Sequence, residues 1–407
     1  MNEKLNNIIY YAKNNVPFYQ EYDDVFDKAQ TPLITKNIVF NRTSDLIADD
    51  YKYFPLSDKL VIRRTSGSTG EYMKIHWDIR HNIKSHMELW FLRKKYYNIH
   101  PKDKYCYFYT TYYTANSIME EKDIMISSNN RSIGFSKNSL TDDRLKEIYL
   151  KILDFSPKYI LGQPSMLLLL AKCKKDYDLP DINSLVYIEL TGEMLFDYAR
   201  KEIMSTFNCI VANQYGCNEA NSIAYECPCG NMHIMESNVY VEILNDSKNT
   251  MDGEEGEIYI TSLTNYAMPF IRYDIGDIGY IEANKKCECG NNSPILHLTK
   301  GRNNDFVLME DGKFTPAYIF VRPIEFINEK IGNIIYQFQV IQNDINNFTV
   351  RLTINKNYNG WKNEIEKLFI SNIKHILMKN ANYSFEYYDK LLPKEESGKL
   401  AYFIKNF

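Results

Sequence analysis

Apolar residues recur along the chain with two different periods. Four segments have the spacing of an amphipathic helix and are predicted to be helical: residues 81–97, 141–155, 165–176 and 197–207. Short runs rich in β-forming residues lie beside them and are predicted to be strands: residues 105–113, 158–165, 184–195 and 209–216. Strands that alternate with helices indicate parallel sheets with helices packed on them, and ligands bind beyond the carboxyl ends of such strands.

The pattern changes in the second half of the chain. Short β segments separated by turn residues occupy 239–281, which predicts a β subdomain over about 227–300. Residues 301–305 are interpreted as a linker that acts as a hinge, and 306–407 combine strands with one amphipathic helix. We therefore expect an α/β protein. Its large N-terminal domain, 1–300, has parallel-rich sheets with flanking helices plus the β subdomain, and its small mobile C-terminal domain is α+β.

Composition excludes several classes of protein. The chain has 407 residues, 44% of them hydrophobic and 25% charged, as expected for a globular protein with a large core. The formal net charge is −4 and no basic block stands out, which argues against a nucleic-acid partner. No run approaches the roughly 18 apolar residues of a membrane span, and the N-terminus has no signal-peptide core. We therefore expect a cytoplasmic protein, as a monomer or a homodimer.

A polar, glycine-containing stretch stands out at residues 64–74, RTSGSTGEYMK. Hydroxyls and glycines fill six consecutive positions: Thr65, Ser66, Gly67, Ser68, Thr69 and Gly70. Glycine lets a backbone bend close to a ligand, and hydroxyls with N–H groups on such a bend suit a polyphosphate, to which Lys74 adds a positive charge. The stretch is not a Walker loop, and a polar surface turn is the alternative interpretation.

Four later motifs accompany this stretch: NQYGCNEA at 213–220, IRYDIGD at 271–277, KGRNNDF at 300–306 and PKEESGK at 393–399. In this order and spacing, the set resembles the adenylate-forming enzymes, which include acyl-CoA synthetases, adenylation domains and luciferases. It is most similar to the phenylacetate–CoA ligase branch, including its short relatives from capsule biosynthesis. The resemblance covers nearly the whole chain, and five ordered motifs are far more specific than any one of them.

The resemblance implies a reaction in two steps. A carboxylic acid reacts with ATP and magnesium to give an acyl-adenylate and pyrophosphate, and the aromatic content of the chain suits an aromatic or medium-sized apolar acid. The acyl group then passes to coenzyme A. Alternative acceptors are the phosphopantetheine thiol of an acyl carrier protein, or an amine in a biosynthetic pathway. A nucleotide-binding relative that has lost catalysis is a further alternative.

The resemblance also implies roles in binding the nucleotide. Residues 65–70 would hold the β- and γ-phosphates, and Arg302 would approach the ribose and phosphate. Gly192 and Glu193 match a turn against the adenine and the acyl pocket. Tyr215 would stack on adenine, and Gly216 leaves room for the nucleotide. Asp277 would accept both ribose hydroxyls. The remaining nucleotide-binding residues are Lys74 and Gln214.

The catalytic roles fall on three further residues. Glu219 would bind magnesium, Asn218 would donate to a phosphate oxygen, and Lys399 would reach the α-phosphate and the substrate carboxylate together. Asn304 occupies the hinge position, where many relatives have aspartate. Three other departures are Tyr72 in place of proline, Asn218 in place of threonine or serine, and Asp274 in place of arginine.

Two cysteine pairs, each in a C-x-C-G sequence, point to a metal. Cys227, Cys229, Cys287 and Cys289 supply four thiolates, enough for a tetrahedral structural zinc site. Because the single-residue spacing is tighter than the usual C-x₂-C, one cysteine could lie only nearby, with His233 as the fourth ligand. Reduced buried cysteines and a redox pair are the alternatives. A closed four-ligand site would pin the β subdomain and leave no open position for catalysis.

Overall fold

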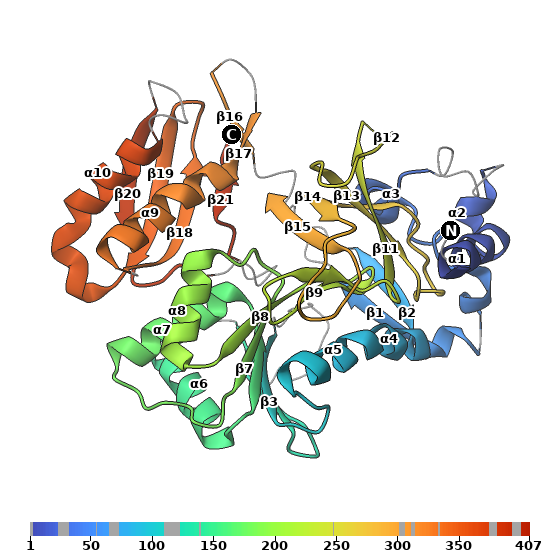
Figure 1. Cartoon of the computed structure of the whole chain (residues 1–407), viewed down its shortest axis with the longest axis horizontal. Coiled ribbons are helices and arrows are strands. Elements are labelled where there is room, and N and C mark those ends of the chain that lie inside the picture. Colours follow the sequence, from blue (N-terminus) through green and yellow to red (C-terminus); the bar gives the residue numbers. More distant parts are fainter. Residues whose placement is uncertain are drawn as a thin grey trace. The chain divides into compact units, whose positions relative to one another are not determined.

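The computed structural model describes residues 3–22, 32–53, 55–64, 73–109, 123–137, 140–246, 248–300, 306–310, 314–332, 334–373, 381–392 and 400–407. The chain divides into two compact units, each made of two stretches of sequence (Figure 1). Unit 1 comprises Met1–Pro101 and Ala212–Arg302, and unit 2 comprises Lys102–Val211 and Asn303–Phe407. Among the described helices, none combines the length and the apolar character that a membrane-crossing helix needs.

The N-terminal stretch of unit 1 is mostly helical. It forms α1 (Glu3–Asn15), α2 (Pro17–Gln20), α3 (Lys36–Asn41), the 3₁₀ turns η1 (Asp49–Tyr51) and η2 (Ser57–Lys59), the hairpin of β1 (Leu60–Arg64) with β2 (Lys74–Asp78), α4 (Ile79–Ser85) and α5 (Met87–Tyr97). Helix α1 buries one apolar face, with Leu5, Ile8 and Ala12 inside. The Asp78 side chain caps α4 by accepting from the N–H groups of Arg80 and His81, which fixes where this helix begins.

The second stretch of unit 1 is an antiparallel sheet. Its strands are β8 (Ile210–Cys217), which begins at the end of unit 2, β9 (Asn221–Glu226), β10 (Met232–Ile234), β11 (Val239–Asn245), β12 (Lys248–Asn249), β13 (Gly256–Ser262), β14 (Tyr273–Glu282) and β15 (Ile295–Lys300). They lie in the order β12-β11-β13-β14-β15-β10-β9-β8. Trp77, Tyr19 and Phe270 are fully buried in the hydrophobic core that this unit forms by itself.

Unit 2 begins with an α/β layer. Strands β3 (Tyr105–Tyr109), β4 (Ile124–Ile126), β5 (Ser132–Ser136), β6 (Tyr159–Gly162) and β7 (Tyr187–Thr191) lie in the order β7-β6-β3-β5-β4, parallel except for β4. Helices α6 (Asp142–Phe155), α7 (Pro164–Asp176) and α8 (Asp197–Phe207) connect and cover them (Figure 1). On β3, Cys106 and Phe108 are buried between half-exposed tyrosines, so the strand turns one face to the core.

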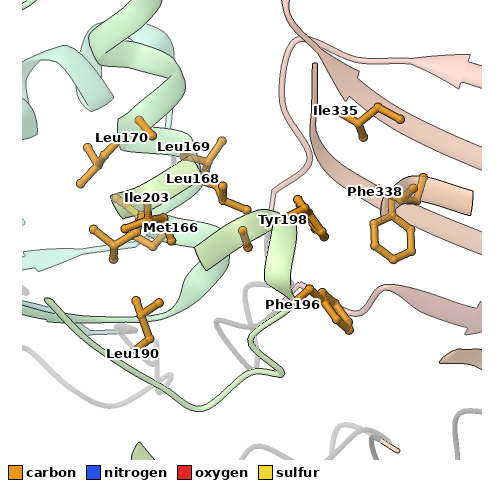
Figure 2. Close-up of a cluster of buried hydrophobic side chains, with 14 of the residues drawn as sticks. Met166, Leu168, Leu169, Leu170, Leu190, Phe196, Tyr198, Ile203, Ile335 and Phe338 are labelled. Atoms are coloured by element: carbon orange, nitrogen blue, oxygen red, sulfur yellow. The ribbon is translucent and has the colours of Figure 1, made fainter. Parts of the chain in front are cut away.

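The C-terminal stretch of unit 2 is α+β. It contains β16 (Phe306–Leu308), β17 (Phe314–Pro316), η3 (Ala317–Phe320), α9 (Val321–Ile331), β18 (Ile335–Gln342), β19 (Asn347–Ile354), η4 (Lys356–Trp361), α10 (Lys362–Ile373), β20 (Asn382–Tyr387) and β21 (Phe403–Lys405). The main sheet has the order β20-β19-β18-β21. Figure 2 shows Phe338 of β18 facing Tyr198 of α8 and Phe196, which directly precedes this helix, so one hydrophobic core runs through both stretches of this unit.

The expected fold class is confirmed. Parallel strands with covering helices, a β-rich region and a C-terminal α+β region are all present. The predicted helix over 81–97 divides at His86 into α4 and α5, and the strand expected from Tyr105 is described as far as Tyr109. The expected hinge, 301–305, lies outside the described residues, so the domain boundary there stays a prediction.

The C-terminal core offers a matched pair of substitutions. Phe320 is fully buried, with its ring centroid 5.7 Å from that of Phe348 and 5.9 Å from that of Phe403, whereas Phe326 on α9 is 41% exposed. We expect Phe320→Ala to lower the free energy of unfolding by about 3–5 kcal/mol, because it removes apolar contacts and leaves a cavity. Phe326→Ala is the control, with an expected change of about 0.5 kcal/mol or less. Equal urea midpoints for the two variants would contradict this packing.

Candidate functional site

The NQYGCNEA motif forms the hairpin of β8 and β9 in unit 1. The strands pair Tyr215 with Ala224 and Gly216 with Ser222, and the register shifts between these two pairs, as in a β-bulge. A Cβ atom added to Gly216 would lie 2.0 Å from the carbonyl oxygen of Asn221. Glycine is therefore required here by the close approach of the two strands, whether or not a ligand also lies nearby.

Two predicted site residues from different motifs meet in this unit. The Tyr215 hydroxyl, on β8, donates to Oδ2 of Asp277, on β14, over 2.7 Å. Both side chains are half-buried. The hydrogen bond orients the carboxylate without neutralising it, so its remaining lone pairs stay available to further donors.

Glu219 lies in the turn between β8 and β9 and is only 4% exposed. Its Oε1 accepts from the Tyr273 hydroxyl over 2.7 Å. Burial, followed by the negative charge of Glu219, raises the pKa of Tyr273 well above its usual value, so this hydroxyl keeps its proton and donates. The neighbouring turn residue, Asn218, accepts at its carbonyl from Nε1 of buried Trp77 over 2.8 Å.

In unit 2, Gly192 and Glu193 directly follow β7. Gly192 has φ +83°, a conformation that favours glycine. The Glu193 carboxylate accepts from the Ser165 N–H over 3.0 Å and from the Ser165 hydroxyl over 2.8 Å. It also accepts from the Leu400 N–H over 3.2 Å.

Several predicted site residues lie outside the described residues: Thr65, Ser66, Gly67, Ser68, Thr69 and Gly70, together with Arg302, Asn304 and Lys399. Their roles stay predictions. Lys74, the first residue of β2, is exposed. Gln214 is buried, and its side-chain amide donates to the Tyr215 carbonyl over 3.1 Å.

The two C-x-C-G sequences adopt the same local turn. The Gly230 N–H donates to the Cys227 carbonyl over 2.9 Å, and the Gly290 N–H donates to the Cys287 carbonyl over 3.1 Å. Both glycines have positive φ, +80° and +74°. These turns lie in unit 1, one between β9 and β10 and the other between β14 and β15.

The turns bring together ligand atoms of Cys227, His233, Cys287 and Cys289, all within 4.8 Å of one another. His233 donates from Nδ1 to the Ser293 carbonyl over 2.9 Å, which leaves Nε2 facing the Cys289 sulfur at 3.3 Å. Cys229 is exposed and is not among the four, so the geometry favours His233 over Cys229 as the fourth ligand.

The electrostatics favour a thiolate at Cys287, whereas burial raises the pKa of the Cys289 thiol. Burial also raises the pKa of the Cys287 thiol, but hydrogen bonds that include those from the Cys289 N–H and from Asn231 outweigh it and lower the pKa from 9.0 to about 6. Asn231 contributes through its side-chain amide, 3.2 Å from the Cys287 sulfur. Thiolates with a correctly oriented imidazole form a donor set suited to a zinc ion.

Sequence reasoning missed the partners of the acidic residues. Tyr273 lies in the quoted IRYDIGD motif, yet nothing in the motif indicated a hydrogen bond to Glu219. Ser165 was recognised only as a residue at a helix start. No pattern in the sequence indicated the contact of Trp77 with Asn218, because the two residues are far apart in the chain and meet only when the unit packs.

Three comparisons with known proteins bear on this arrangement. The family model of the CapK C-terminal domain matches residues 315–406. Protein CapK of Staphylococcus aureus is 27% identical over 272 residues, which are 65% of this chain and 56% of that protein. Phenylacetate-coenzyme A ligase of Thermus thermophilus is 26% identical over 197 residues, 47% of this chain and 43% of that protein. The chain thus spans about half the length of the curated relatives that it matches.

Among solved structures, the crystal structure of 2-hydroxyisobutyryl-CoA ligase in the postadenylation state with 2-HIB-AMP has a TM-score of 0.75 to this chain. The match covers 99% of this chain and 88% of that chain, at 14% sequence identity. At this identity, the likeness shows a shared fold.

The buried pair of Glu219 and Tyr273 leads to a stability prediction. Tyr273→Phe removes the donor and leaves a 4% exposed carboxylate without this hydrogen bond, so the free energy of unfolding should fall by about 1–3 kcal/mol. Tyr53→Phe, at a side chain that is 73% exposed, is the control and should change it by about 0.5 kcal/mol or less. Urea unfolding measures both. If the urea midpoint of Tyr273→Phe equals that of the control, the hydrogen bond from Tyr273 to Glu219 does not stabilise the fold.

Proposed function

The chain belongs to the adenylate-forming superfamily, in the branch that contains CapK and phenylacetate–CoA ligase, and on that premise we propose that it activates a carboxylic acid with ATP. In the first step, a carboxylate oxygen of the acid attacks the α-phosphorus, and the bond to pyrophosphate breaks. In the second step, the thiol of coenzyme A loses its proton and attacks the acyl carbonyl, and AMP leaves. The proposal places this reaction in the cytoplasm, where both cosubstrates are found.

The observation that carries the proposal is the contact between Tyr215 and Asp277. The two residues are 62 positions apart in the chain, yet the hydroxyl of one lies 2.7 Å from the carboxylate of the other. A carboxylate with free lone pairs suits the vicinal hydroxyls of a ribose, and an aromatic ring beside it suits the face of an adenine. The pair therefore supports the nucleotide roles that the motifs imply.

The remaining roles need charge neutralisation rather than covalent chemistry. Glu219 would hold magnesium through a carboxylate that Tyr273 orients, and the ion would neutralise phosphate oxygens. Asn218 would donate its amide to a phosphate oxygen. Residues 65–70, with Lys74, would bind the β- and γ-phosphates, and Arg302 the ribose. Lys399 would stabilise the negative charge that develops at the α-phosphate during attack.

The proposal also covers the acid that is activated and the acceptor of its acyl group. We propose an aromatic or medium-sized apolar acid and coenzyme A. A carrier-protein phosphopantetheine thiol or an amine would use the same acyl-adenylate, so these acceptors are outcomes of the test below. A bound nucleotide without exchange activity for any acid would instead indicate a relative that has lost catalysis.

We also propose that Cys227, His233, Cys287 and Cys289 hold a structural zinc ion. The donor set fits the ion, because three thiols and one oriented imidazole give the four ligands of a closed site. When bound, the ion would tie the turn after β9 to the turn after β14. All four positions are taken by protein ligands, so the residues serve the fold of unit 1 and leave no position for a substrate.

The first test is ATP–pyrophosphate exchange with a panel of carboxylic acids, repeated with coenzyme A, carrier proteins and amines as acceptors. With the preferred acid, Lys399→Ala should reduce exchange by about 100-fold or more, because a charge that stabilises the transition state is lost. ATP affinity, measured by calorimetry, should stay near that of the unaltered protein. Lys405→Ala, an exposed lysine of β21, is the control. Exchange by Lys399→Ala at the unaltered rate would exclude this lysine from the mechanism.

The second test concerns the metal. Protein purified without chelators should contain about one zinc ion per chain, and Cys287→Ser should lose most of it together with thermal stability. Cys229→Ser is a matched control, because Cys229 occupies the same position in its C-x-C-G sequence as Cys289 but lies outside the cluster. This variant should keep its zinc. Loss of zinc from Cys229→Ser alone would reverse the ligand assignment, and zinc far below one per chain in the unaltered protein would refute it.

A further inference from the structure

The turn that carries Glu219 contains only residues 218–220, because it joins β8 directly to β9. Asn221 closes the turn with φ +61°, the left-handed conformation that often follows a three-residue hairpin loop. Its side-chain amide donates to the Ser85 hydroxyl over 2.7 Å and to the side-chain oxygen of Asn82 over 3.2 Å, both on α4. A side chain on a loop is placed precisely only where further contacts hold the loop.

Two buried side chains hold the backbone on either side of Glu219. Before it, Nε1 of Trp77 donates to the Asn218 carbonyl over 2.8 Å. After it, the side-chain amide of Asn238 donates to the Ala220 carbonyl over 2.8 Å. Trp77 is fully buried and Asn238 is 1% exposed, so both bonds form away from water, where they are stronger. The residue between the two carbonyls is thus fixed from both directions.

The Asn238 amide uses its full set of groups. Besides the bond to Ala220, Nδ2 donates to the Ser222 carbonyl over 2.5 Å, and Oδ1 accepts from the Thr264 hydroxyl over 2.7 Å. Asn238 directly precedes β11, and Thr264 lies just after β13. A buried amide with both donors and its acceptor paired adopts one orientation. Through it, the turn is tied to two other strands of the sheet in unit 1.

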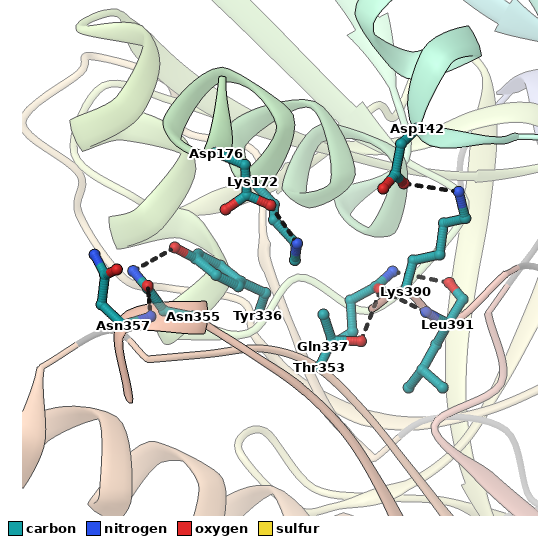
Figure 3. A network of polar contacts seen from close by, with 10 residues as sticks. All are labelled: Asp142, Lys172, Asp176, Tyr336, Gln337, Thr353, Asn355, Asn357, Lys390 and Leu391. Carbon is teal, nitrogen blue, oxygen red and sulfur yellow. Dashed lines mark hydrogen bonds and ion pairs between the residues drawn. The ribbon is translucent and has the colours of Figure 1, made fainter. Parts of the chain in front are cut away.

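Unit 2 contains a comparable arrangement that includes no predicted site residue. In Figure 3, the buried side-chain amide of Gln337, on β18, donates to the Leu391 carbonyl over 3.1 Å and accepts from the Leu391 N–H over 2.9 Å. Its Oε1 also accepts from the hydroxyl of Thr353, a fully buried residue, over 3.4 Å. Each unit thus holds a backbone segment by a buried amide and a threonine hydroxyl. A change at Thr353 therefore reports the general cost of losing such a hydroxyl.

We propose that Asn238 is a positioning residue, whose amide fixes the turn before β9 and thereby places the Glu219 carboxylate for magnesium. This inference rests on the proposed function, in which Glu219 holds the ion. The carboxylate fits that role, because its hydrogen bond from the Tyr273 hydroxyl leaves lone pairs for a hard cation. Asn238 acts through the backbone and is not itself a ligand. Loss of a residue that orients a metal ligand lowers metal affinity by about 10- to 100-fold.

The first test measures the Mg²⁺ concentration that gives half-maximal pyrophosphate exchange. Asn238→Ala removes both donors and should raise this concentration about tenfold, while KM for the acid stays constant. Thr264→Val removes only the hydroxyl that orients the amide, at nearly constant size, and should have a smaller effect in the same direction. Thr264→Ser keeps the hydroxyl and should behave like the unaltered protein. Thr353→Val, the control in unit 2, should lower stability without changing the magnesium dependence.

The second readout needs neither activity nor a bound ion. Hydrogen–deuterium exchange of the unliganded protein, followed by mass spectrometry of peptides that contain residues 217–222, reports how firmly the turn is held. Deuterium exchange there should be about tenfold faster in Asn238→Ala than in Thr353→Val. If Asn238→Ala does not fold, Thr264→Val decides, with a smaller increase expected.

The two readouts together distinguish the positioning role from the proposed function. If the unaltered protein activates no acid but deuterium exchange in the turn still accelerates, Asn238 positions the turn and the proposed function fails. Unchanged deuterium exchange in the turn overturns the positioning role. Faster deuterium exchange that leaves the magnesium dependence of an active protein unchanged overturns it as well.

Discussion

The close approach of β8 and β9 at Gly216 is the constraint on which the candidate site depends. Only a residue without a side chain leaves room for the carbonyl of Asn221, so the hairpin can form with its bulge at this point. The bulge changes the direction of the strand between Tyr215 and the turn that carries Glu219. Both side chains then reach partners on β14, Asp277 and Tyr273. A larger residue at this position would disturb both contacts together.

The acidic residues singled out by the motifs share one kind of environment. Glu219, Asp277 and Glu193 each accept a hydrogen bond from a hydroxyl group, of Tyr273, Tyr215 and Ser165 respectively. Such a donor orients a carboxylate and offsets part of its desolvation, but it leaves the negative charge in place. A carboxylate held in this way can still bind a cation, a ribose hydroxyl or a backbone N–H. This common arrangement is consistent with sites prepared for ligands rather than with closed ion pairs.

The cysteine cluster has a different character. Each of its two turns spans the four residues of one C-x-C-G sequence and is closed by the same hydrogen bond, from the glycine N–H to the first cysteine's carbonyl. The fourth donor, His233, comes from the neighbouring strand β10. The imidazole is oriented by the Ser293 carbonyl, so the cluster is defined by contacts outside the cysteine sequences as much as by the cysteines themselves. Since this region joins β9, β10, β14 and β15, a bound ion would stabilise the part of the sheet that follows the β8–β9 hairpin.

The sequence by itself determined the periodicity of the helices and strands, the alternation of α and β elements, and the family resemblance. These depend on local patterns, such as the Thr141 cap that starts α6 or the apolar face of α1, and local patterns are readable in order along the chain. The sequence also indicated that a second ligand set containing His233 was feasible.

The tertiary structure decided which groups meet. Sequence spacing could not show that Tyr273 donates to Glu219, or that Glu193 faces Ser165 and Leu400. Nor could it show that His233, rather than Cys229, completes the cysteine cluster. Each of these contacts joins residues that are far apart in the chain, and a side chain's partner there depends on how strands pair and turns fold. The physical reason is that periodicity reports the face on which a residue lies, whereas hydrogen-bond partners are selected only when separate faces pack together.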